Sequence, residues 1–174
     1  MKKYLKYSGI CAALFAVVAF ILMLATPALA FRTTVLGQEV EGDPISGAVA
    51  IFGKTENNIV THGAWVGVVA FILVLVAIVI IVAGIVLPLL KVNALEKFAG
   101  VLNLVAVGAL ITAGILMFFL APAFYGANND GKAIPDGVTG VLKAGWVISA
   151  ILSIVAGAFA ILPAAFDFVG SKKK

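Results

Sequence analysis

The sequence predicts an all-α transmembrane protein: a four-helix bundle with a small extracytoplasmic β-hairpin in its first outer loop. Of its 174 residues, 63% are hydrophobic and only 11% are charged, whereas about a quarter of a soluble domain is charged. Four long stretches contain no Asp, Glu, Lys, Arg or His. This composition excludes a soluble globular fold and a disordered chain, and the single cysteine excludes a disulfide scaffold.

Each of the chargeless stretches is long enough to cross a bilayer as a helix. They cover residues 9–30, 63–90, 98–120 and 144–166, and about 20 helical residues suffice for a hydrocarbon core about 30 Å thick. The stretches lack the alternating polarity of barrel strands, so helices are expected. The spans then form one integral membrane domain, whose two outer loops comprise residues 31–62 and 121–143.

The position of the lysines predicts the orientation of the spans. Eight lysines flank one end, where they face only Glu96 and Asp167, which leaves a net charge of +6. The other side has four cations and six carboxylates, a net charge of −2. Because cytoplasmic segments are enriched in Lys and Arg, a multi-pass protein of the cell membrane with both termini in the cytoplasm is expected. The eight lysines are Lys2, Lys3, Lys6, Lys91, Lys97, Lys172, Lys173 and Lys174.

The first span has a second interpretation, as a cleaved signal peptide. Lys2, Lys3 and Lys6 would be its basic region, and cleavage would follow the small-x-small sequence 28–30. Its apolar stretch is longer than the 7 to 15 residues or so that are usual in a signal peptide. A retained span is therefore favoured, and cleavage stays open.

Small residues at helical spacing predict the faces through which the spans pack, because association in lipid depends on close approach of backbones. Asn103 is expected to bond across helices, to Ser149, Ser153 or a backbone carbonyl, since an unpaired amide in hydrocarbon is costly. Trp65 and Trp146 open two spans and are predicted to be interface anchors. The predicted packing set is Gly63, Gly67, Ala70, Asn103, Gly145, Ser149, Ser153 and Gly157.

The two halves of the chain are weakly similar, since each reads as an out-and-back helical hairpin. Pro27 and Pro122 end the first and third spans, and Gly63-Ala64-Trp65 and Ala144-Gly145-Trp146 open the second and fourth. Duplication would give a parallel repeat. The general roles of proline and tryptophan in membrane helices also explain the match and are the favoured explanation, while duplication stays open.

The first outer loop is predicted to form the β-hairpin, with strands at residues 33–36 and 48–52. Between them Glu39, Glu41 and Asp43 alternate, which favours a solvated acidic face over a cation site. The second outer loop is expected to be a turn near residues 126–131 followed by an irregular link.

The path from Phe31-Arg32-Thr33-Thr34-Val35-Leu36-Gly37 to Ile51-Phe52-Gly53, followed by three spans, resembles functionally uncharacterised small bacterial four-span membrane proteins. That resemblance implies no activity. The plan of inside termini and a longer first outer loop is similar to claudin-like tetraspan topology. The claudin first loop carries a Trp and Gly-Leu-Trp motif and a cysteine pair, and this loop has neither, so claudin sealing or pore selectivity does not carry over.

Three classes of function follow from these features. A structural, scaffold or accessory interaction protein is favoured, because chargeless spans with small-residue faces suit packing and partner binding. The alternative is an oligomeric channel or transporter component, which the lack of ionisable residues in the spans disfavours. An enzyme is not expected, since no catalytic, metal-binding or cofactor-binding pattern occurs. The expected partners are the lipid bilayer and a second copy or another membrane protein; a net charge of +4 that reports topology gives no reason to expect nucleic acid.

Overall fold

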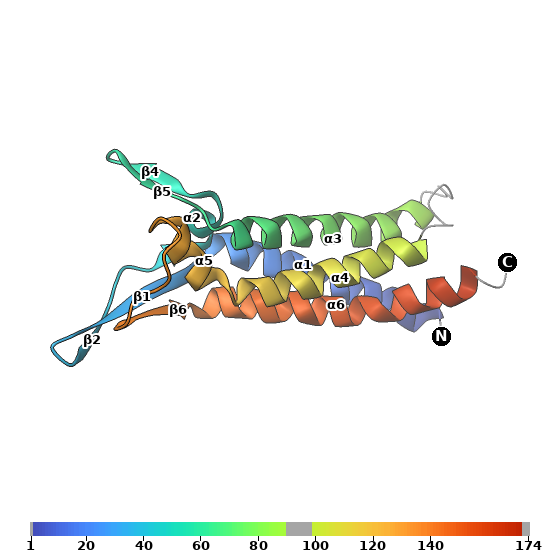
Figure 1. Cartoon of the computed structure of the whole chain (residues 1–174). Helices are drawn as coiled ribbons and strands as arrows, with labels where there is room; N and C mark the ends of the chain where they lie inside the picture. The colour runs from blue at the N-terminus through green and yellow to red at the C-terminus, as the bar shows by residue number, and fades with distance from the viewer. Residues whose placement is uncertain (1, 90–98, 172–174) are drawn as a thin grey trace.

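Four long helices lie side by side in the computed structural model, which describes residues 2–89 and 99–171 (Figure 1). The start of α1 and the end of α6 lie at one end of these helices, which we call the terminal end. The strands lie at the opposite end, which we call the sheet end. The predicted inner connection with Lys91, Glu96 and Lys97, and the lysines 172–174, lie outside the described residues. The helices are α1 (Lys2–Ala25), α3 (Trp65–Leu89), α4 (Ala99–Met117) and α6 (Ala144–Ser171).

All four helices are long and apolar enough to cross a membrane, so this is a membrane-embedded protein. The four predicted long apolar helices are present in the predicted order, but the first and third end before the predicted ends of their spans. The first helix ends at Ala25, five residues before the predicted end, because the chain continues as a strand. The third ends at Met117, where a turn separates it from the short helix α5 (Leu120–Ala127).

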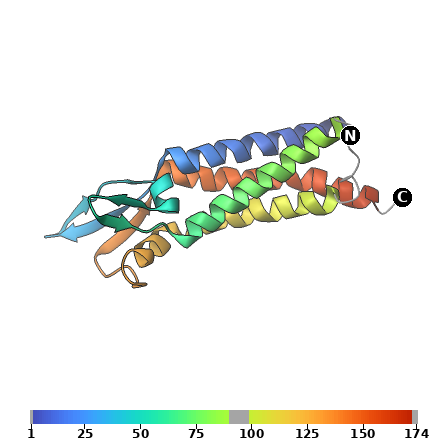
Figure 2. The ribbon, with the colours of Figure 1, turned by 90° about the horizontal axis from the view of Figure 1, so that it is seen from above.

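α6 packs against both α1 and α4, and α3 completes the arrangement by packing against α4 and α1 (Figure 2). Alanine dominates the buried positions along the helices, with Ala12, Ala16 and Ala19 of α1 fully buried. Such small side chains allow the close helix approach that stabilises association in lipid. Larger buried side chains, including Trp146 and Met23, gather at the sheet end.

A sheet built around one long strand continues the α1–α6 helix pair beyond the helices. β1 (Pro27–Val35) follows α1 directly, and β6 (Val138–Leu142) leads directly into α6. The two strands pair antiparallel from Leu29 with Leu142 to Thr33 with Val138. On its other edge β1 pairs with β2 (Gln38–Glu41) and β3 (Ile45–Ser46). The sheet therefore joins the first and second loops of the sheet end.

The predicted first-loop hairpin exists, but its second strand was wrongly assigned. Residues 33–35 pair with β2 across the turn at Leu36 and Gly37, whereas residues 48–52 belong to the helix α2 (Gly47–Phe52). Ser46 caps this helix by accepting a bond from the Val49 N–H. The short apolar run is compatible with a strand or a helix by pattern, and the cap together with burial of its small side chains selects the helix.

Besides the pairing of β1 with β3, the sheet end contains two other strand pairs that were not predicted. β4 (Lys54–Glu56) and β5 (Ile59–Thr61) form a separate two-stranded hairpin. The second loop, which was expected to be irregular after its turn, contains β6, and this strand pairs antiparallel with β1. The two halves of the chain also diverge at the sheet end, because Pro27 begins a strand while Pro122 lies within α5.

Candidate interaction surface

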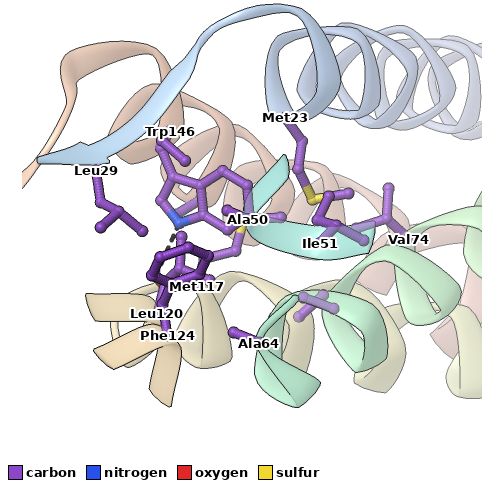
Figure 3. Close-up of a cluster of buried hydrophobic side chains, with 14 residues drawn as sticks. Met23, Leu29, Ala50, Ile51, Ala64, Val74, Met117, Leu120, Phe124 and Trp146 are labelled. Atoms are coloured by element: carbon purple, nitrogen blue, oxygen red, sulfur yellow. Dashed lines mark hydrogen bonds between the residues drawn. The ribbon is translucent and has the colours of Figure 1, made fainter. Parts of the chain in front are cut away.

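The base of the sheet is fixed by a buried cluster around Trp146 (Figure 3). Leu29 of β1 and Leu120 and Phe124 of α5 surround the indole, and its Nε1–H donates to the Met117 carbonyl over 2.9 Å. The predicted interface anchor is therefore a fully buried core residue, because β1 and α5 cover the start of α6. Trp65 is 65% exposed, and its role as an anchor stays a prediction.

The predicted small residues of α6 lie at its contacts with α1 and α4. Ser149 Oγ donates to the Ala19 carbonyl of α1 over 2.6 Å, and Ser153 Oγ donates to the Ser149 carbonyl over 3.0 Å. A β-carbon at Gly145 would lie 2.8 Å from Cγ2 of Thr26. At Gly157 it would lie 2.8 Å from the Ile111 side chain of α4. At both positions a larger residue would require the neighbouring side chain to move.

The predicted residues of α3 and α4 are divided between two regions. Gly63 and Gly67 approach Ile51 of α2, and Ala70 is fully buried farther along α3. The Asn103 amide oxygen instead lies beside Gly84, where an added β-carbon would be 3.6 Å from it. Asn103 is thus placed at the α3–α4 contact, while the α6 serine hydroxyls donate to backbone carbonyls.

An ion cluster on one face of the sheet ties the first hairpin to the start of α6. Arg32 Nε lies 2.9 Å from Glu41 Oε2, its guanidinium lies 3.7 Å from Glu39, and Lys143 also pairs with Glu41. Hydrogen bonds from Lys143 and Arg32 lower the pKa of Glu41. Two of the three alternating acids therefore lie beside cations of this chain, as part of a solvated charged face.

The opposite face of the hairpin carries apolar and polar side chains and is only partly covered. Near the base, Phe31 packs against Tyr125 of α5 with ring centroids 5.6 Å apart. Farther out Val35 and Val40, on paired strands, are 51% and 55% exposed. The projecting end of the β1–β2 hairpin (Figure 1) therefore has a charged face and a second face, on which the exposed Val35 and Val40 lie beside their cross-strand partners Gln38 and Thr33.

The turn at the hairpin tip presents an apolar side chain at a conformational cost. Leu36 and Gly37 have φ values of 50° and 79°, as a two-residue type I′ turn requires. Leucine adopts positive φ with difficulty, yet Leu36 is 99% exposed and gains no packing in return. The other hairpin has Asn57 and Asn58 at the equivalent positions, which tolerate this conformation.

A side-chain clamp fixes the base of the β4–β5 hairpin to α5. Asn128 Oδ1 accepts the backbone N–H of His62 over 2.7 Å, and Asn128 Nδ2 donates to the His62 carbonyl over 2.9 Å. This residue was predicted only as part of a turn. Its amide satisfies both backbone groups of His62, and Nδ2 also donates to the Phe124 carbonyl of α5.

In residues 2–89 and 99–171, no three His, Cys, Asp or Glu side chains lie close enough together to hold a metal ion. No protein-family model matches the chain, and no curated protein matches it. The interaction surface is therefore interpreted from its own geometry.

Proposed function

We propose that this protein is a structural or accessory interaction protein of the cell membrane. It is anchored by a four-helix bundle and displays the β1–β2 hairpin to a partner. The observation that carries this proposal is the tip: Leu36 is held fully exposed at positive φ, next to the bare apolar Val35 and Val40. Exposed apolar groups on a projecting hairpin are typical of protein contacts.

The proposed topology has both termini in the cytoplasm and the sheet end outside. It is supported by the sequence, in which the two terminal segments and the predicted inner connection carry a net charge of +6 and the two predicted outer loops a net charge of −2. Residues 1–30 are proposed to be retained, since α1 packs along α6 and Ser149 bonds to its Ala19 carbonyl. Loss of α1 would uncover this buried face of α6.

The composition of the bundle interior supports packing over transport. Between the helices the buried positions are mostly alanine, and the hydroxyls of Ser149 and Ser153 are already bonded to backbone carbonyls. At the sheet end, α2 and the Trp146 cluster fill the space between the helices. A channel or transporter component is the second candidate, and flux through proteoliposomes in excess of protein-free vesicles would favour it.

The role in interaction is tested by photocrosslinking in living cells. A photoreactive amino acid replaces Leu36, with matched replacements at Asn57 on the other hairpin tip and at Val79 on the exposed face of α3. Discrete protein adducts from position 36, weak or absent at 57, are expected, and position 79 should capture lipid. The same adducts at all three positions, or no protein adducts at position 36, would contradict the proposal.

A further inference from the structure

The outer edge of β2 is an unpaired strand edge with a defined pattern. The Gly42 N–H donates to the Phe31 carbonyl over 2.9 Å, and antiparallel pairs alternate between hydrogen-bonded and non-hydrogen-bonded. Counting along the register, the backbone groups of Val40 point to β1, whereas those of Glu39 and Glu41 point away from it. Within the described part of the chain, β2 pairs with β1 alone.

The side chains along this edge define what could pair with it. Glu39 and Glu41 lie on the charged face, where Arg32 pairs with both and Lys143 pairs with Glu41 from the β1 side, and Val40 lies on the opposite face. The side chains of an added strand would therefore lie opposite Glu39, Val40 and Glu41, on alternating faces of the sheet. Opposite charges stabilise such cross-strand pairs and like charges destabilise them.

A second copy of the chain fits this edge poorly. Antiparallel pairing of two β2 strands about Val40 would set Glu39 of each copy opposite Glu41 of the other. The strained, exposed Leu36 beside the edge indicates a partner all the same, because its conformation is costly and none of the described residues 2–89 and 99–171 covers it.

We propose that the β2 edge binds an extended segment of a partner protein with the pattern basic, apolar, basic, which adds to the sheet as a further strand. The backbone groups of Glu39 and Glu41 would form the ladder, their carboxylates would face the basic side chains, and Val40 would contact the apolar one. This mode of recognition combines main-chain bonds with side-chain specificity. The inference rests on the proposed interaction function and specifies the partner for the same surface.

The test measures peptide binding to the full chain in nanodiscs of zwitterionic lipid, which does not attract cationic peptides. The probe is a fluorescent peptide Thr-Lys-Val-Lys-Thr with blocked ends. Its controls are Thr-Glu-Val-Glu-Thr and a permuted peptide with adjacent lysines. Anisotropy is expected to show roughly tenfold tighter binding of the probe than of either control, weakened by salt.

Two proline variants separate strand addition from simple charge attraction. Glu39→Pro removes a backbone N–H that points away from β1, so no hydrogen bond to β1 is lost. Thr55→Pro makes the same change on β4, because Thr55 and Val60 likewise form a non-hydrogen-bonded pair. Glu39→Pro is expected to abolish probe binding, Glu39→Gln to weaken it a few-fold, and Thr55→Pro to leave it unchanged. Hydrogen exchange at Thr33 and Val40 verifies that the first hairpin persists in Glu39→Pro.

Failure of the strand-addition inference can be distinguished from failure of the proposed interaction function. Equal binding of basic and acidic peptides, no probe binding, or binding that survives Glu39→Pro would overturn the strand-addition inference. If photocrosslinks at Leu36 persist under any of these results, the interaction function stands and only the partner chemistry is wrong. If those crosslinks are absent as well, both fail.

Discussion

The two hairpins at the sheet end share a turn type but differ in how they are supported. The β1–β2 hairpin lies within a larger sheet, flanked by β6 and held by ion pairs to Arg32 and Lys143. The β4–β5 hairpin is a separate two-stranded sheet, attached at its base by Asn128. Two strands alone are marginally stable in water. The comparison shows that a braced hairpin can carry a costly apolar tip, whereas the free-standing one has the undemanding Asn57 and Asn58.

The largest expected effect is at the base of the β4–β5 hairpin, where Gly63 lies against α2. A β-carbon there would be 2.7 Å from the Ile51 carbonyl carbon, and backbone cannot move aside as a side chain can. Gly63→Ala should lower the free energy of unfolding by about 3 kcal/mol or prevent folding. Gly108→Ala, with nothing within 4 Å, is the control, and thermal unfolding in detergent is the measurement. Equal melting temperatures for the two variants would refute the close approach.

The next effect concerns the base of the β1–β2 hairpin. Trp146→Phe keeps most of the apolar volume but leaves the Met117 carbonyl without its indole donor. We expect a loss of about 1–3 kcal/mol, the cost of an unsatisfied buried polar group. Trp65→Phe, at an exposed position, should change the same thermal unfolding curve little. A neutral Trp146→Phe would mean that this bond does not support the base of β1.

Removing the clamp should affect one hairpin and spare the other. Asn128→Ala deletes both bonds to His62 and should cost about 1–2 kcal/mol. Hydrogen exchange should quicken at residues 59–61 and stay unchanged at residues 32–35. Asn129→Ala, which removes a bond to Tyr125 within the same turn, serves as the matched variant. Equal changes in both hairpins would contradict their separate support.

Exchanging the tip residues should change stability in opposite directions. Leu36→Asn places a residue that tolerates positive φ at the strained position and should stabilise the protein by about 0.5–1 kcal/mol. Asn57→Leu should destabilise it by a similar amount. Thermal unfolding of both variants measures the difference. A destabilised Leu36→Asn would show that Leu36 has packing that compensates its conformation.

The smallest effect is a pH dependence. Lys143 and Arg32 lower the pKa of Glu41, and Lys54 lowers that of Glu56, both from an ordinary value of 4.5. Each folded carboxylate thus stabilises the fold above its unfolded pKa, and this contribution is lost as the pH falls through the lowered folded value. Because both groups are exposed, the change should be small and reduced by salt. Glu41→Gln should flatten the acid limb of stability, measured by unfolding between pH 6 and 3, and an unchanged limb would contradict it.

The spans could be predicted because their signal is local. A chargeless run of twenty or more residues has one common solution in lipid, and the four runs gave the four helices. Buried Ser149, Ser153 and Ala70 followed from helical spacing. The helix boundaries were harder to predict, since residues 27–30 are as apolar as a span but form the start of β1, which pairs with β3 and β6.

The sheet end was predicted less well because its strands depend on distant pairing. The β6 segment Val138-Thr139-Gly140-Val141-Leu142 is rich in β-branched residues, and Asn57-Asn58 between short strands is a hairpin signal. Both signals were present in the sequence. The burial of Trp146 and the Asn128 clamp had no local signal, because each depends on contacts across the fold.

The proposed interaction function requires that the sheet end faces the outside of the cell. Cysteine labelling in intact cells tests this orientation most directly. Cys11 is first replaced by alanine, and single cysteines then replace Leu36 and Lys3. A membrane-impermeant maleimide should label position 36 in intact cells, and position 3 only after the membrane is permeabilised. Labelling of position 3 in intact cells, with position 36 protected until permeabilisation, would contradict the account.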